Sequence, residues 1–262
     1  MRKSVPDDRY PRARKSLGQH FLVDRRAITA IVSAIPEGSS VLEIGPGRGA
    51  LTRPLLRRAG RLVVIEKDDR LAAEWQRVAE EWAGLRVIHG DVMEELEATL
   101  CRHRPDWIVG NLPYNISGPL TARLVARTLP GGMVLMYQKE VADRIGAEPG
   151  CGRGCGAIGV ISRYCWRITR LLRLPPGAFA PPPRVHSAVL RFTPNGRSFD
   201  AEAFAALQRC VRTGFAHRRK TIANNLRGRI EPEMLRGCGI DPALRPEQLT
   251  QAQWLRLAAA LT

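Results

Sequence analysis

The chain lacks any run of about 18 or more apolar residues, so the sequence offers no membrane-spanning segment. Its first residues, MRKSVPDDRYPRARKS, are basic but lack the apolar stretch of a secretory signal. Hydrophobic residues still make up 44% of the 262 residues, which is enough for a sizeable core. We therefore expect a globular cytoplasmic protein with no membrane partner. We also expect the chain to be a monomer.

Closely spaced cysteine pairs are also scarce. The six cysteines are Cys101, Cys151, Cys155, Cys165, Cys210 and Cys238. Only Cys151 and Cys155 lie close together, in the glycine-rich stretch CGRGC, whereas structural zinc usually takes two such pairs. The cysteines therefore predict free thiols of a reducing compartment and no metal site.

Acidic residues are nearly absent from one part of the chain. Residues 163–229 hold fourteen basic and two acidic side chains, and residues 1–26 hold eight and three. The segment 27–162 between them is neutral, although the whole chain carries a net charge of +16. Such a neutral body with basic flanks favours binding of a nucleic acid on particular surfaces.

Short apolar runs alternate with amphipathic stretches between residues 40 and 138. The runs are 41-VLEIG, 62-LVVIE, 86-RVIHGD, 107-WIVGN and 133-MVLMYQ. Nearly continuous apolar strands separated by helices predict a mostly parallel sheet with both faces covered. The fold class is therefore α/β, and further strands at about 158–170 and 186–192 would complete the sheet.

The character of the sequence changes after this region. The stretch 175-PPGAFAPPPR holds five prolines and predicts a rigid surface loop rather than a helix or strand. Beyond it, Phe204, Leu207, Val211 and Phe215 recur at helical spacing. We expect a catalytic domain over 1–193, with a basic N-terminal arm over 1–26, and a small all-helical domain over 194–262.

A glycine turn follows the first predicted strand, in 41-VLEIGPGRGAL. Gly45, Gly47 and Gly49 would permit unusual backbone angles and close approach of a ligand to the backbone. Glu66 ends the next strand and can accept hydrogen bonds from both hydroxyls of a ribose. Asp91, after the third strand, is a candidate for reading an adenine amine or for capping a helix. These features alone fit either a dinucleotide or S-adenosylmethionine.

The fourth strand ends in Asn111-Leu112-Pro113-Tyr114, which favours methyl transfer. The exocyclic amine of adenine is a poor nucleophile, because its lone pair is delocalised into the ring. The Asn111 side-chain oxygen and the Leu112 carbonyl can accept hydrogen bonds from that amine, and Pro113 fixes the turn that aims the carbonyl. Tyr114 offers a flat face on which an extruded base can stack.

Basic residues near the C-terminus are candidates for phosphate contact. Arg218, Arg219 and Lys220 lie at the start of a predicted helix in 217-HRRKTIANNL. Arg184 and Arg191, beside the proline-rich loop, are weaker candidates. A solvated helix face remains the alternative interpretation.

The motifs occur together in an order that resembles one family, the ribosomal RNA adenine N6,N6-dimethyltransferases of the KsgA type. The resemblance is carried by 16-SLGQHFLVD, GPGRG, VIEKD, GDVM, NLPYNIS, 137-YQKEVADRI, 178-AFAPPPRVHSAVLRF and 216-AHRRKTIANNL. It implies a Rossmann-like class I methyltransferase domain that uses S-adenosylmethionine. It also implies that the substrate is two adjacent adenosines in the 3′-terminal hairpin loop of small-subunit rRNA, methylated in an immature small subunit.

The resemblance further implies roles for matched positions. The residues implied to bind the cofactor are His20, Leu22, Gly45, Gly47, Glu66, Asp91 and Asn111. His20 stands where many bacterial members carry Asn, and the stretch 148-EPGCGRGCGAIG is richer in Gly and Cys than usual.

Three other functions share some of these features. A large-subunit rRNA adenine N6-methyltransferase of the macrolide-resistance type would share the glycine turn and the tetrapeptide, but the full APPPRVHSAV and RRKTIANNL stretches favour the small-subunit enzyme. A DNA adenine methyltransferase typically has Pro or a similar residue where this chain has Leu112. A non-catalytic RNA-binding assembly factor would not need the intact acceptor positions.

Overall fold

The computed structural model describes residues 13–14, 17–152 and 154–261. The chain divides into two compact units, of which the first takes in 1–117, 129–138 and 171–191. The second takes in 118–128, 139–170 and 192–262, so it includes more of the chain than the helices after residue 193. The predicted boundary at 193/194 stays a prediction. No helix in the described ranges is long and apolar enough to cross a membrane.

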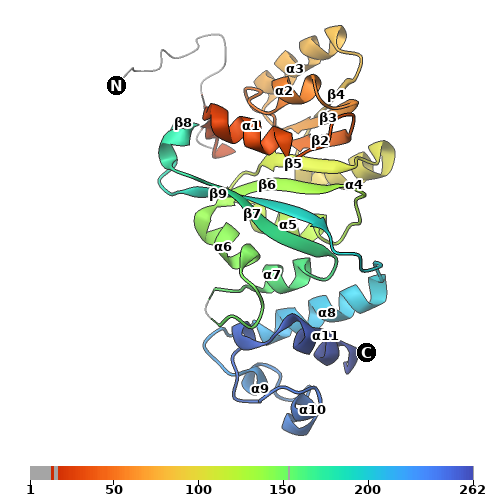
Figure 1. Cartoon of the computed structure of the whole chain (residues 1–262), viewed down its shortest axis with the longest axis vertical. Helices are drawn as coiled ribbons and strands as arrows, with labels where there is room; N and C mark the ends of the chain where they lie inside the picture. The colour runs from red at the N-terminus through yellow and green to blue at the C-terminus, as the bar shows by residue number, and fades with distance from the viewer. Residues whose placement is uncertain (1–12, 15–16, 153, 262) are drawn as a thin grey trace. The chain divides into compact units, whose positions relative to one another are not determined.

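A seven-stranded sheet contains the strands that the sequence predicts. Its five strands from the apolar runs are β2 (Ser40–Ile44), β3 (Arg61–Glu66), β4 (Leu85–His89), β5 (Trp107–Asn111) and β6 (Gly132–Gln138), and β7 (Trp166–Leu174) and β9 (Ser187–Pro194) complete it. The strand order is β4-β3-β2-β5-β6-β9-β7, and the four neighbouring pairs from β4 to β6 are parallel. The predicted mostly parallel α/β sheet is therefore confirmed (Figure 1).

The order of the strands creates a switch point beside β2. The chain runs from β2 outward through β3 to β4, and then returns to form β5 on the other side of β2. Val41 pairs with Leu62 of β3 and with Trp107 of β5. Ligands of such sheets bind beyond the carboxyl ends of the strands at this reversal.

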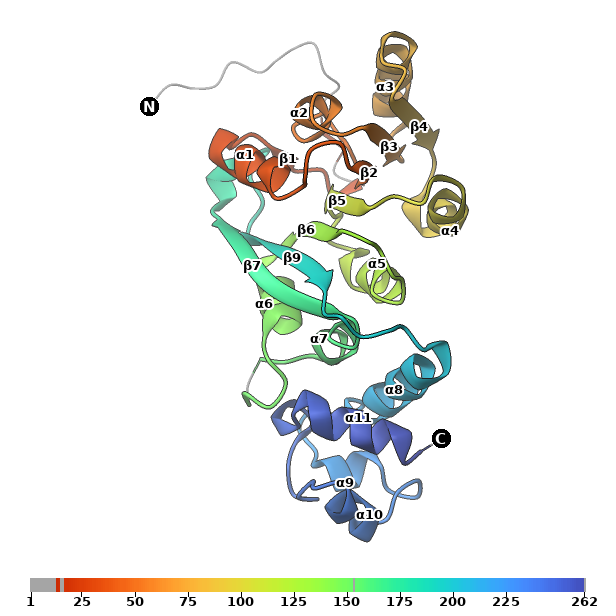
Figure 2. The ribbon, with the colours of Figure 1, turned by 45° about the vertical axis from the view of Figure 1, so that its right-hand side comes forward.

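Helices cover both faces of this part of the sheet. Three of them, α1 (Arg25–Ser33), α2 (Thr52–Leu56) and α3 (Asp69–Glu81), bury apolar side chains against one face. Ile31, Leu55 and Trp75 pack there with Val41 and Val64. Helix α4 (Val92–His103) lies on the opposite face (Figure 2). Alternating strand side chains are therefore apolar on both faces, which explains the continuous apolar runs.

The proline-rich stretch is not entirely irregular. It contains a 3-10 turn, η2 (Pro176–Ala178), and a two-residue strand, β8 (Phe179–Ala180). This strand pairs antiparallel with β1 (Phe21–Leu22) near the N-terminus. Pro181 directly follows β8 and has no backbone N–H to donate, so the pairing ends at Ala180 on that side.

The expectation of a strand over 158–170 is wrong in its first part. Residues Ala157–Ser162 form helix α7, and β7 begins only at Trp166. Short apolar runs do not distinguish a buried strand from a buried helical turn by periodicity alone. Here Gly156 provides an extended residue before the helix, and Val160 and Ile161 are buried.

The second unit is mainly helical. Its helices are α5 (Ser117–Leu124, which begins one residue before the unit), α6 (Lys139–Gly146), α7, α8 (Ala201–Gly214), α9 (Ile222–Asn225), α10 (Pro232–Gly237) and α11 (Gln251–Ala259), with a 3-10 turn, η3 (Pro246–Gln248). Asp200 caps α8 through hydrogen bonds from Glu202 and Ala203. Trp254 of α11 is fully buried and stacks on Phe215, so it is a packing residue.

Candidate active site

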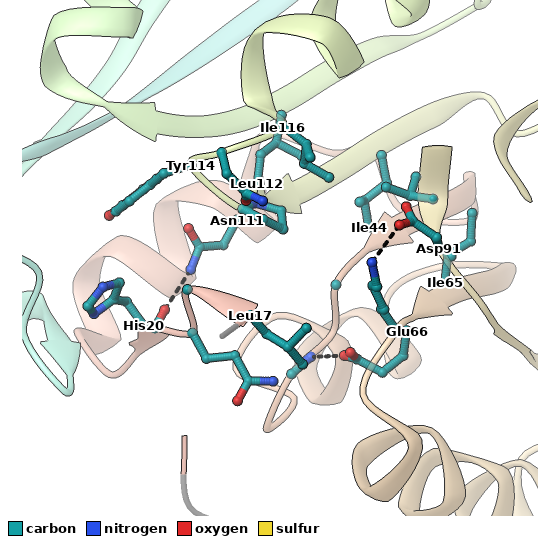
Figure 3. Close-up of a pocket in the computed structure, with 18 of the residues that line it drawn as sticks. Leu17, His20, Ile44, Ile65, Glu66, Asp91, Asn111, Leu112, Tyr114 and Ile116 are labelled. Carbon is teal, nitrogen blue, oxygen red and sulfur yellow. Dashed lines mark hydrogen bonds and ion pairs between the residues drawn. The ribbon is translucent and has the colours of Figure 1, made fainter. Parts of the chain in front are cut away.

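A pocket opens at the carboxyl ends of β2, β3, β4 and β5 (Figure 3). Each strand contributes one of the predicted site positions: Gly45, Glu66, Asp91 and Asn111. The remaining lining residues are Leu17, Gly18, Gln19, His20, Phe21, Ile44, Gly47, Ile65, Lys67, Gly90, Val92, Leu112, Pro113, Tyr114, Asn115 and Ile116. Parallel strands bring these positions together because their carboxyl ends share one edge of the sheet.

The glycine turn needs glycine at all three positions. Gly45, Gly47 and Gly49 have φ angles of 68°, 55° and 84°, a region that other residues rarely adopt. A Cβ atom at Gly49 would lie 2.4 Å from the ring of Trp75. The same ring donates from Nε1 to the Gly47 carbonyl at 2.9 Å, which fixes the turn from outside the pocket.

Glu66 is held by backbone amides on both of its carboxylate oxygens. Gly47 N–H donates to Oε2 at 3.0 Å, and Asp68 N–H donates to Oε1 at 2.8 Å. Burial raises the pKa of Glu66, while the bonds from Asp68 and Gly47 act in the opposite direction. The carboxylate is thereby fixed beside the glycine turn, with lone pairs left over for further donors.

Asp91 caps a helix and also lines the pocket. Its Oδ1 accepts the Met93 N–H at 2.8 Å at the start of α4. Its Oδ2 accepts from Lys67 Nζ at 2.6 Å. The hydrogen bonds from Lys67 and then from Met93 lower the pKa of Asp91. The two roles that the sequence left open for Asp91, helix cap and pocket residue, are therefore compatible.

Asn111 is oriented by the backbone of the N-terminal segment. Its Nδ2 donates to the His20 carbonyl at 2.9 Å (Figure 3). Because the amide nitrogen is engaged, Oδ1 is the group left to accept a hydrogen bond from a ligand. Leu112, next in the chain, has a buried side chain that packs the tetrapeptide into the unit.

Tyr114 lies against His20 and is tied by its hydroxyl to Ser187. The rings of His20 and Tyr114 stack with their centroids 5.8 Å apart and their planes at 24°. The Tyr114 hydroxyl and Ser187 Oγ are 3.0 Å apart, and Ser187 is fully buried. His20 Nδ1 donates to the Pro181 carbonyl at 2.8 Å. The proline-rich stretch therefore fixes the aromatic side of the pocket.

Several residues that hold the site in place were not predicted from the sequence. Gln19 Nε2 donates to Asp68 Oδ2 at 2.9 Å, and Arg14 pairs with Asp69 at 2.7 Å. These bonds anchor the segment before β1 over the glycine-turn side of the pocket. Their partners lie 49 or more positions apart, so no local pattern indicated them. Lys67 and Ser187 were missed for the same reason.

Not all predicted positions line the pocket. Leu22 is buried in β1, while the lining segment ends one residue earlier, at Phe21. Arg184 is exposed in the proline-rich stretch. Arg218, Arg219 and Lys220 are exposed in the turn before α9, which begins only at Ile222 with Thr221 as its cap. Their proposed roles in binding stay predictions.

No cluster of three or more His, Cys, Asp or Glu side chains suited to a metal exists in the described ranges. Cys151 is exposed, whereas Cys155 is buried and its thiol contacts the Gly156 carbonyl at 3.7 Å. Burial raises the pKa of Cys155 to about 11, which keeps it protonated at neutral pH.

The strand order and the glycine turn define a Rossmann-like fold, and the Asn111–Tyr114 tetrapeptide in the pocket over the switch point makes it that of a methyltransferase. The model of the ribosomal RNA adenine dimethylase family matches residues 11–262. The chain therefore belongs to the ribosomal RNA adenine dimethylase family.

Relatives and solved structures agree with this assignment. Proteins named "Ribosomal RNA small subunit methyltransferase A" from Xanthomonas euvesicatoria pv. vesicatoria and Xanthomonas axonopodis pv. citri are each 43% identical over 253 residues, covering 94% of this chain and 95% of theirs. A dimethyladenosine transferase from Plasmodium falciparum superposes with a TM-score of 0.75 at 25% identity, covering 91% of this chain and 96% of that one. A 23S rRNA methyltransferase has the same fold, with a TM-score of 0.70 at 22% identity over 92% of this chain and 99% of that one.

Proposed function

We propose that this chain transfers methyl groups from S-adenosylmethionine to the N6 amines of two adjacent adenosines in the 3′-terminal hairpin loop of small-subunit rRNA. One observation carries the proposal: a single pocket is lined both by the glycine turn at Gly45 and by the Asn111–Tyr114 tetrapeptide. The relatives named for the small subunit, at 43% identity, favour this substrate.

The pocket suits S-adenosylmethionine in the chemistry of its walls. Glu66 would accept hydrogen bonds from the ribose hydroxyls, and Asp91 would accept a hydrogen bond from the adenine amine. Gly45 and Gly47 would border the amino-acid part, and His20 and Leu22 would border the cofactor on the N-terminal side. Ile44, Ile65 and Val92 offer apolar surface between the carboxylates. When bound there, the cofactor supplies an electrophilic methyl group on a sulfonium.

The residues of the tetrapeptide would prepare the target amine. Asn111 Oδ1 and the Leu112 carbonyl accept its hydrogen bonds, which favours a nitrogen with an available lone pair. Pro113 holds the turn, and Tyr114 stacks on the extruded base. As the new carbon–nitrogen bond forms, the amine becomes acidic and loses a proton to solvent. No strong general base is required, so the chain contributes mainly positioning.

The basic residues would hold the RNA backbone. Arg218, Arg219 and Lys220 are exposed on one turn, and Arg184 is exposed on the proline-rich stretch. Each phosphate that they neutralise releases counterions, so binding should weaken as salt rises. The partner would be an immature small ribosomal subunit in the cytoplasm, bound by a monomer of this chain.

The proposal is tested by mass spectrometry of rRNA nucleosides. Unmethylated small subunits are incubated with the protein and S-adenosylmethionine, and N6,N6-dimethyladenosine should appear in the 3′-terminal hairpin fragment. The Asn111→Ala variant provides the matched control and should give little product. Methylation of large-subunit rRNA or of duplex DNA in preference to small subunits would overturn the proposal.

A further inference from the structure

The edge of the pocket carries an ion pair that the proposed chemistry does not use. Lys67 follows Glu66 at the end of β3, and Asp91 follows β4. Lys67 Nζ lies 2.6 Å from Asp91 Oδ2, and both residues line the pocket. In Figure 3 this ion pair is the dashed line that ends at Asp91. The Lys67 side chain is 59% exposed and that of Asp91 is 26% exposed. A positive charge therefore lies at the position where the adenine amine should be recognised.

Both oxygens of Asp91 already have donors. Oδ1 accepts the Met93 N–H at the start of α4, and Oδ2 accepts from Lys67. The hydrogen bond and the charge of Asp91 raise the pKa of Lys67, with a smaller contribution from the charge of Glu94. Both partners remain charged at neutral pH, and a ligand amine on this side of Asp91 must displace Lys67 or share a carboxylate oxygen that already has a donor.

The two residues have opposite preferences for a purine. A 6-amino group is a donor and suits the carboxylate of Asp91, whereas a 6-oxo group is an acceptor and suits the ammonium of Lys67. The methylene stem of Lys67 can lie along a base while its charged end stays at the pocket edge. Selectivity for the amine is therefore a balance between these two side chains.

We propose that Lys67 is a specificity-determining residue of the cofactor pocket, which competes with a purine 6-amino group for Asp91 and donates to a 6-oxo group. The inference rests on the proposed function, because it requires the cofactor's adenine to lie beside Asp91. The inference predicts that the wild-type protein discriminates less strongly between a ligand with adenine and one with the 6-oxo base hypoxanthine than a pocket with Asp91 but without Lys67 would.

Calorimetry on the full chain tests this with S-adenosylhomocysteine and S-inosylhomocysteine as the two probes. In Lys67→Met, the adenosyl compound should bind about three- to fivefold more tightly, since an exposed ion pair no longer competes with it. The inosyl compound should bind about tenfold more weakly, because its charged donor is removed. Added salt should narrow the difference between wild type and variant in adenosyl affinity.

Four further variants isolate the effect of Lys67 on the two affinities. Lys67→Arg keeps a charged donor and should preserve the wild-type ratio of the two affinities. Lys139→Met removes another exposed lysine, which is paired with Asp143 and does not line the pocket. This variant should also preserve the wild-type ratio of the two affinities. Asn can still cap α4, so in Asp91→Asn the further change Lys67→Met should alter adenosyl binding much less than it does in the wild type.

The failure of this inference is distinguishable from failure of the proposed function. If the wild type binds the adenosyl compound and Lys67→Met leaves the ratio of affinities within about twofold, the inference is wrong while the cofactor assignment stands. If the wild type binds neither compound, the proposed cofactor is wrong and the inference falls with it.

Discussion

The amide of Asn111 is fixed by the backbone carbonyl of His20, a residue 91 positions earlier in the chain, through a hydrogen bond of 2.9 Å. The carbonyl belongs to the main chain, so the bond does not depend on which side chain stands at position 20. Pairing of β1 with β8 secures this segment immediately after His20. The N-terminal segment therefore decides which atom of Asn111 faces a ligand.

Replacing Asn111 with Ala should abolish most of the methylation. The variant lacks the Oδ1 acceptor, and loss of one preorganised transition-state hydrogen bond lowers kcat by about 100-fold or more. Single-turnover methylation of unmethylated small subunits measures the effect. Gln76→Ala, which removes an exposed amide on α3, is the control and should keep wild-type activity. Activity of Asn111→Ala within about threefold of wild type would contradict the mechanism.

Tyr114 should act through its ring, with Ser187 holding that ring in place. Tyr114→Ala should lower kcat/KM by about 10- to 100-fold, since stacking of a base on an aromatic ring is worth about 1–3 kcal/mol. Tyr114→Phe keeps the ring but not the 3.0 Å hydrogen bond with Ser187 Oγ, so a smaller reduction is expected.

Ser187→Ala supplies the matched test of that hydrogen bond. It should reproduce the small effect of Tyr114→Phe, and the double variant should be no worse than either single one, because both remove the same interaction. Additive effects in the double variant would show that Ser187 acts in some other way.

Glu43 should make the stability of the protein depend on pH. This carboxyl of β2 is only 2% exposed, and burial raises its pKa from 4.5 to about 8, with a further rise from the charge of Glu66. The pKa is higher in the folded than in the unfolded chain. The contribution of protonated Glu43 to the free energy of unfolding is therefore complete below about pH 4.5, and it is lost as the pH rises towards about 8.

Thermal unfolding followed by circular dichroism between about pH 5 and about pH 9 measures this dependence. The Tm of the wild type should fall across that interval by more than the Tm of Glu43→Gln, which has no proton to lose. Parallel Tm curves for the two proteins would show that Glu43 is ionised in the folded state.

The exposed turn before α9 should contribute to RNA affinity through charge alone. Changing Arg218, Arg219 and Lys220 to Ala should weaken RNA binding and reduce the slope of log K against log salt by about 0.7–0.9 for each phosphate that is no longer neutralised. Arg236→Ala, which removes an exposed arginine paired with Glu233 in α10, is the control. An unchanged slope in the triple variant would show that this turn does not bind phosphate.

The sequence predicted the positions on which the pocket depends. Gly45, Gly47 and Gly49 were identifiable because their turn requires positive φ angles, and all three have them. Glu66, Asp91 and Asn111 were identifiable because each ends or follows an apolar run, and parallel strands bring such ends together. Over 157–162 the expectation of a strand was wrong, because a short apolar run does not distinguish a buried strand from a buried helical turn.

What the sequence determined by itself was the five strands from the apolar runs, the glycine turn and the residues at the ends of those strands, because these depend on local spacing and backbone angles. Only the tertiary structure decided which side chains hold the site in place. The bonds of Asn111 to His20, of Tyr114 to Ser187 and of Asp91 to Lys67 join residues 91, 73 and 24 positions apart. Contacts of this kind arise from the order of strands in the folded sheet, which no local pattern encodes.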